Sequence, residues 1–176
     1  VASWEPIRTL LGGYTVRIGA LRGEGLSGGA ISDAVGGGSM PEVAARFARD
    51  RPEVVVVALG TNDAWNEKLT EPAAIDGLDR IVDAFSADAC IVGVTITESS
   101  TSSDERKSYD REEAGVINEA IRERVDVVVP WGEESSAAAD ELLQPDGIHT
   151  TPAGRVRFAE MVADGVAECG VGPLRP

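Results

Sequence analysis

The stretch "PEVVVVALGTND" at residues 52–63 decides how this chain folds. Four consecutive valines open an apolar run that is bounded by Pro52 and Gly60. A run that is apolar throughout, without alternation, is typical of a parallel strand that helices cover on both faces. The stretch therefore predicts a buried strand over residues 53–60, with polar residues on the turn that follows it.

Three further segments are rich in β-branched residues and predict strands. They are "YTVRIGAL" (14–21), "ACIVGVTI" (89–96) and "VDVVVPW" (125–131). Segments with apolar residues at helical spacing separate them. These predicted helices lie at 39–50, 72–85, 110–125 and 151–169. Strands that alternate with helices predict an α/β fold with a doubly wound parallel sheet, and we expect a single domain over 1–176.

Two of the predicted helices carry start signals. Ser39 and Glu42 have capping-box spacing, and Thr151 precedes Pro152, as an N-cap precedes a proline in the first helical turn. These signals fix the expected beginnings of the helices at 39–50 and 151–169.

The composition excludes several classes of protein. The 176 residues carry a net charge of −14, which disfavours nucleic acid, anionic membranes and anionic substrates as partners. No apolar run approaches the roughly 20 residues of a membrane span, and the first residues lack the pattern of a signal peptide. With one histidine and two cysteines, no zinc site of the usual ligand number is expected.

The segment "GEGLSGG" (23–29) contains the glycine spacing of dinucleotide-binding loops, at Gly23, Gly25 and Gly28. Such a loop has to open a long helix that faces the pyrophosphate. Here only "AISDAV" (30–35) follows before more glycines. A structural glycine-rich loop is therefore the stronger interpretation.

Two other motifs carry polar side chains of the kinds that take part in catalysis. In "ALGTND", Asn62 follows the buried strand, and its amide either stabilises an oxyanion or caps its own turn. In "DGIHTTPAG", Asp146 stands three residues before His149, the only histidine. A carboxylate at this spacing can accept the imidazole N–H and leave the other nitrogen as a general base.

Together and in this order, the three motifs resemble the SGNH, or GDSL-type, hydrolases. The resemblance implies a flavodoxin-like three-layer α/β/α fold. It assigns Asp146 and His149 to a catalytic triad, and Gly28 and Asn62 to the oxyanion hole. It also implies ester hydrolysis through an acyl-enzyme without a metal or organic cofactor.

The first block of that family, a strand that ends in GDS with the nucleophilic serine, does not occur in this sequence. Three explanations stay open: the nucleophile lies on a segment outside this sequence or on another chain, the protein is a truncated or inactive relative, or Ser3 or Ser27 replaces it. In the family that strand lies between the strands predicted at 14–21 and 53–60. Unpaired strand edges are costly, so we expect something to fill the position.

The resemblance implies a small acyl ester as substrate, such as an acetylated sugar or cell-wall glycan. Two alternatives use the same fold: an O-acyltransferase, and a non-catalytic glycan-binding or scaffold protein that has lost its serine.

The two cysteines also fit this fold. Cys90 begins a predicted strand, and the last helix runs back to the same end of the sheet at Cys169. A disulfide between them is geometrically possible, and it would imply an extracellular or exported protein.

Overall fold

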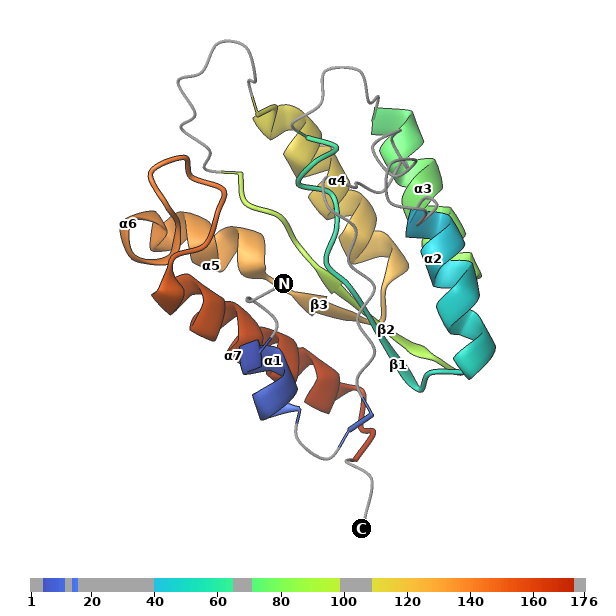
Figure 1. Cartoon of the computed structure of the whole chain (residues 1–176). Helices are drawn as coiled ribbons and strands as arrows, with labels where there is room; N and C mark the ends of the chain where they lie inside the picture. Colours follow the sequence, from blue (N-terminus) through green and yellow to red (C-terminus); the bar gives the residue numbers. More distant parts are fainter. Residues whose placement is uncertain (1–4, 12–13, 16–39, 65–70, 99–108, 173–176) are drawn as a thin grey trace, which may run out of the picture.

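The computed structural model of the chain describes residues 5–11, 14–15, 40–64, 71–98 and 109–172, and these form an α/β fold with a parallel sheet (Figure 1). Most of the strand predicted at 14–21 and all of the glycine-rich segment 23–29 lie outside these residues, as does Ser39 of the predicted capping box.

Three of the predicted strands are confirmed. They are β1 (Val54–Val57), β2 (Cys90–Val94) and β3 (Val127–Val129). The sheet order is β1-β2-β3, and both pairings are parallel. Each strand is shorter than predicted at both ends, and at the carboxyl end of the sheet the chain passes into loops after β1 and β2 and into α5 after β3. No strand of the described ranges pairs with the outer edge of β1.

Helices cover both faces of the sheet, which gives three layers (Figure 1). On one face lie α2 (Met40–Phe47), continued by the 3-10 helix η3 (Ala48–Asp50), α3 (Glu71–Asp83) and α4 (Arg111–Arg124). On the other lie α1 (Glu5–Leu10), α5 (Trp131–Ala137) and α7 (Pro152–Glu168), with α6 (Ala139–Leu142) beside α7.

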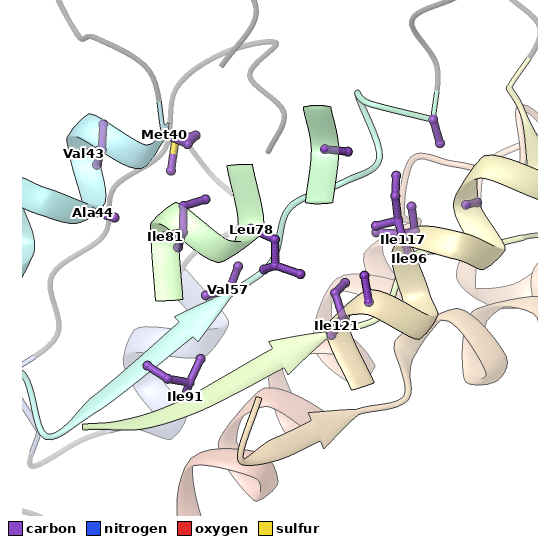
Figure 2. Packing of buried hydrophobic residues seen from close by; sticks show 14 of the residues in the cluster. Met40, Val43, Ala44, Val57, Leu78, Ile81, Ile91, Ile96, Ile117 and Ile121 are labelled. Atoms are coloured by element: carbon purple, nitrogen blue, oxygen red, sulfur yellow. The ribbon is translucent and has the colours of Figure 1, made fainter. Parts of the chain in front are cut away.

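The helical stripes predicted from the sequence form the core on the first face. Figure 2 shows Leu78 of α3 and Ile121 of α4 directed toward the strands, where they belong to one buried cluster with Val57 and Ile91. Complete burial of such a side chain stabilises the fold by about 1.5–3 kcal/mol. A second cluster joins Val162 of α7 to the opposite face of the sheet.

The predicted N-cap Thr151 is confirmed, since its hydroxyl accepts a hydrogen bond from the N–H of Gly154 at 3.0 Å. Asp110 caps α4 in the same way, through the N–H groups of Glu112 and Glu113. The sequence did not predict α5 and α6, because these helices are too short to show an apolar stripe.

Cys90 and Cys169 form a disulfide with their Cα atoms 5.9 Å apart. The bond joins the first residue of β2 to the C-cap of α7, so the last helix returns to the amino end of the sheet as expected. None of the described helices is sufficiently long and apolar to cross a membrane.

Candidate active site

His149 lies on a loop that is closed on itself between α6 and α7. The chain pairs antiparallel at Leu143 and Thr150, and the N–H of Gln144 donates to the carbonyl of His149 at 2.6 Å. Gly147 turns the loop with φ of 71°, a backbone region that side chains rarely adopt. This closure holds the histidine at the carboxyl edge of the sheet, just before α7.

The side chains of Asp146 and His149 meet as predicted. Nδ1 of His149 lies 2.7 Å from Oδ2 of Asp146. An ionised carboxylate only accepts hydrogen bonds, so Nδ1 carries the proton and Nε2 of the neutral ring keeps its lone pair. The imidazole side chain is 63% exposed, which leaves it accessible to a substrate.

Asp146 is held in its ionised form. Burial opposes ionisation, but hydrogen bonds from the N–H of Ile148, from the imidazole and from the N–H of His149 outweigh it and lower the pKa of the carboxyl group. Both N–H groups lie 2.9 Å from Oδ1. The aspartate therefore stays negatively charged at neutral pH and orients the ring.

Asn62 lies on the turn that follows β1, at the same edge of the sheet. The N–H groups of Asp63 and Ala64 both donate to the carbonyl of Gly60, at 3.0 and 3.1 Å. Gly60 has φ of 116°, and a Cβ there would lie 2.9 Å from Ile117. The turn therefore depends on a glycine, and it places the half-buried Asn62 beyond the carboxyl end of the strand.

A cavity of about 230 Å³ lies between the turn that carries Asn62 and the loop that carries His149. Thr61, the neighbour of Asn62, lines it, as do Ile148 and Thr150, the neighbours of His149. The walls also include residues that follow β2 and residues of α5 and α7. The two motifs, which are more than 80 residues apart in sequence, therefore border the same space.

A larger groove of about 690 Å³ runs along the whole outer edge of β1. Apolar residues of α2 line one side, and residues of α1 and α7 line the other. We call this space the β1 groove. It shares Ala58, Thr61 and Phe158 with the smaller cavity, so the two spaces adjoin at the carboxyl end of β1.

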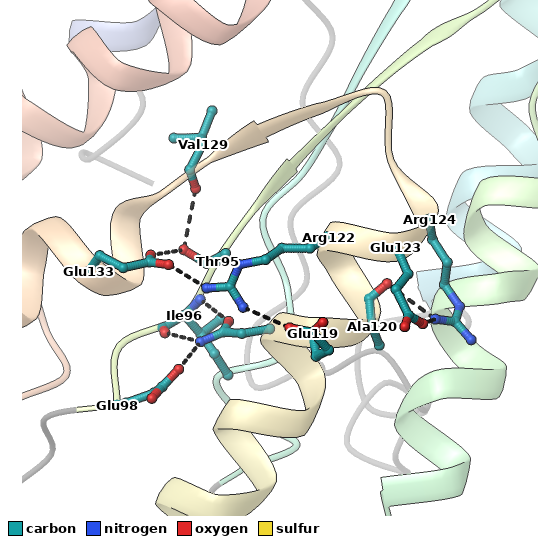
Figure 3. A network of polar contacts seen from close by, with 11 residues as sticks. Thr95, Ile96, Glu98, Glu119, Ala120, Arg122, Glu123, Arg124, Val129 and Glu133 are labelled. Carbon is teal, nitrogen blue, oxygen red and sulfur yellow. Dashed lines mark hydrogen bonds and ion pairs between the residues drawn. The ribbon is translucent and has the colours of Figure 1, made fainter.

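Buried polar contacts fix the segment that follows β2, which forms one wall of the small cavity. The Thr95 hydroxyl donates to the carboxylate of Glu133 at 3.0 Å, and Glu133 in turn pairs with Arg122 at the surface (Figure 3). The fully buried Asn118 accepts from the N–H of Ile96 at 2.7 Å and donates to its carbonyl at 2.9 Å. Thr95 and Ile96 are thereby held in place beyond the last ladder residue.

The structure brings Asp146 and His149 into contact and places Asn62 at the same edge of the sheet. Gly28, Ser3 and Ser27 lie outside the described residues. No cluster of histidine, cysteine, aspartate or glutamate that could hold a metal occurs within the described ranges.

Sequence reasoning missed Arg155, which lines the small cavity from the first turn of α7. The signal that could have indicated it is its position, six residues after His149 on a helix predicted to begin at the site. That position alone did not show which way the side chain points.

The sequence model of the GDSL-like lipase/acylhydrolase family matches residues 6–156. A search of curated proteins gave no match.

Two solved structures resemble this one in fold. A carbohydrate acetylesterase from Sinorhizobium meliloti has a TM-score of 0.73 at 18% identity, covering 94% of this chain and 84% of its own. A lipase/acylhydrolase from Enterococcus faecalis has a TM-score of 0.60 at 16% identity, covering 73% of this chain and 67% of its own. At these identities the likeness concerns the fold alone.

Proposed function

The chain belongs to the GDSL-like lipase/acylhydrolase family, a family of ester hydrolases, and we propose that it removes small acyl groups, acetyl above all, from carbohydrate esters. The observation that carries this proposal is the contact between Asp146 and His149 beside a small cavity. A histidine oriented by an ionised carboxylate is the general base that a serine nucleophile needs.

The reaction proceeds in two steps, acylation of the serine and then its deacylation. A serine hydroxyl attacks the ester carbonyl while Nε2 of His149 takes its proton, and the oxyanion is stabilised by the Gly28 N–H and the Asn62 amide. Collapse expels the alcohol, which takes the proton from His149, and leaves an acyl-serine. Water then attacks the acyl group with His149 again as base, and the carboxylic acid and the free serine are released.

We place the nucleophile on a strand seated in the β1 groove. The groove adjoins the small cavity at the carboxyl end of β1, so a strand parallel to β1 would end beside the Asn62 turn. The apolar side chains on both sides of the groove suit a strand that is buried on both faces. With this strand in place, residues 1–176 complete a single domain of the family's type.

Two further observations support details of the proposal. The small cavity favours a short acyl group, and the carbohydrate acetylesterase similar in fold supports a sugar ester. The disulfide between Cys90 and Cys169 supports an exported protein, since such bonds persist in oxidising compartments.

Labelling with a fluorophosphonate, followed by intact mass and peptide mapping, tests the mechanism. We expect one stoichiometric adduct on a serine and hydrolysis of p-nitrophenyl acetate. Both should be lost in His149→Gln. The matched control is Glu141→Gln, which alters an exposed side chain of α6 just before the loop. The protein tested has to include the strand that carries the nucleophile. Hydrolysis that persists in its His149→Gln variant, or the absence of both labelling and hydrolysis in the wild type, would refute the proposal.

A further inference from the structure

Arg155 differs from the other half-buried arginines of the described ranges. Arg124 pairs with Asp79, and Arg157 pairs with Glu134. Within the described residues, the guanidinium of Arg155 donates one hydrogen bond, to the carbonyl of Thr150 at 3.5 Å, which is at the limit for such a bond. Since a guanidinium has five N–H donors, most of its capacity is not used by the described residues.

This arginine lines the small cavity beside His149. Thr150, whose carbonyl it contacts, is the residue next to His149 in the sequence. Apolar side chains form much of the remaining wall, and among them Trp131 and Phe158 pack edge to face with ring centroids 5.2 Å apart. The cavity therefore combines one cationic group with an apolar, aromatic wall.

We propose that Arg155 determines substrate specificity by binding a carboxylate group of the ester substrate in the small cavity. The inference rests on the proposed function and specifies its substrate class. A carboxylate matches the planar guanidinium and forms charge-assisted hydrogen bonds with it. Neutral esters of the same size lack this partner.

The overall charge of −14 opposes anions at long range, and the sequence alone predicted that anionic substrates are disfavoured. At physiological salt, however, exposed charges are screened beyond about 8 Å. A half-buried guanidinium in contact with the substrate is screened much less. The local contact therefore decides binding within the cavity, while the distant charges mainly affect the approach of the substrate.

The carboxylate can belong to the acyl part or to the alcohol part, and two pairs of esters distinguish these sources. For the acyl side, the p-nitrophenyl monoester of succinate is compared with that of succinamic acid. For the alcohol side, 4-acetoxybenzoate is compared with 4-acetoxybenzamide. In each pair the ratio of kcat/KM for the charged and neutral ester is measured in the wild type, Arg155→Lys, Arg155→Gln and the control Arg80→Gln, an exposed arginine of α3.

We expect the charged ester to be preferred by about tenfold or more in one pair, the effect of one hydrogen bond to a charged group. Arg155→Gln should abolish the preference, Arg155→Lys should retain part of it, and Arg80→Gln should leave it unchanged. Equal ratios in the wild type and Arg155→Gln for both pairs would overturn the inference.

Equilibrium binding of succinate and succinamide, followed by NMR, separates this inference from the proposed function. Binding of succinate that depends on Arg155, in a protein that hydrolyses no ester, refutes the proposed function and retains the carboxylate site. Hydrolysis without any dependence of binding or of the kcat/KM ratio on Arg155 refutes the carboxylate site and retains the hydrolase.

Discussion

Oδ1 of Asp146 accepts two backbone N–H groups while Oδ2 lies 2.7 Å from Nδ1 of His149. One carboxylate thus closes its own loop and orients the neighbouring imidazole. The side chain of Asp146 therefore serves both the loop and the proposed catalysis. The substitution Asp146→Asn removes its charge and keeps its shape, so this variant tests what the charge contributes to each.

Asp146→Asn should lower kcat of ester hydrolysis by on the order of 10²–10⁴-fold. The amide can donate to Nδ1, which favours the tautomer with the proton on Nε2 and removes the general base. Steady-state kinetics with p-nitrophenyl acetate measures the loss, and Asp140→Asn on the exposed part of α6 serves as control. A loss smaller than tenfold would mean that Asp146 does not orient the base.

The same substitution should change the acid sensitivity of the fold. The pKa of Asp146 is lower in the folded than in the unfolded chain, so its stabilising contribution is fully present above the unfolded pKa of about 3.9. The contribution is lost as the pH falls through the lower, folded pKa. Urea unfolding between pH 6 and pH 2 should show a smaller acid-induced loss of stability in Asp146→Asn. Identical pH profiles of the two proteins would contradict this assignment.

Asn118→Ala should destabilise the fold by about 2–4 kcal/mol. The substitution leaves both the buried N–H and the buried carbonyl of Ile96 without their side-chain partner. Glu119→Ala, at the neighbouring and 68% exposed position, should change the stability by less than about 0.5 kcal/mol. Urea unfolding compares the two variants. Equal losses would show that the amide does not hold this segment.

Gly93→Ala and Gly115→Ala should have opposite effects. A Cβ at Gly93 would lie 2.6 Å from Ile121 and 2.7 Å from Val125, and such overpacking typically costs about 1–3 kcal/mol. At Gly115, within α4, a Cβ meets no atom within 4 Å, so alanine should stabilise the helix by about 0.5–1 kcal/mol. Thermal unfolding should give a lower Tm for the first variant and a higher Tm for the second. The same direction of change in both would contradict the packing at β2.

Much of the fold could be predicted because its signals are local. Runs of valine and isoleucine predicted β1, β2 and β3, and Thr151 before Pro152 predicted the start of α7. The ends of the strands could not be predicted. Ile96 follows the β-branched run of β2, but its N–H and carbonyl bond the side chain of Asn118 on a distant helix, so it lies outside the ladder. Thr95 still donates its N–H to the carbonyl of Val129 in β3, while its hydroxyl donates to Glu133.

The candidate site was predictable where a short motif carries its residues, as for Asn62 after β1 and for Asp146 and His149. The spacing of Asp146 and His149 already predicted their contact. Arg155 was missed because its role depends on a cavity whose walls come from distant segments, including the turn at Thr61 and the residues after β2. The sequence of a single segment does not show which distant residues line a cavity with it.

Removal of the disulfide should lower the free energy of unfolding, because the bond closes a long loop of the chain. Cys90 and Cys169 are 79 residues apart in sequence, and cross-linking a loop of this length stabilises a fold by roughly 4.5 kcal/mol in the chain-entropy model. The double variant Cys90→Ala/Cys169→Ala should therefore unfold at lower urea concentration than the oxidised wild type.

The reduced wild type is the matched control, because it keeps both side chains and loses only the bond. If the constraint on the unfolded chain dominates, the reduced protein and the double variant should be equally destabilised. A double variant that is far less stable than the reduced protein would instead assign the effect to lost packing of Cys169 against the cluster that joins Val162 of α7 to the sheet. A reduced protein as stable as the oxidised one would show that the bond does not anchor α7.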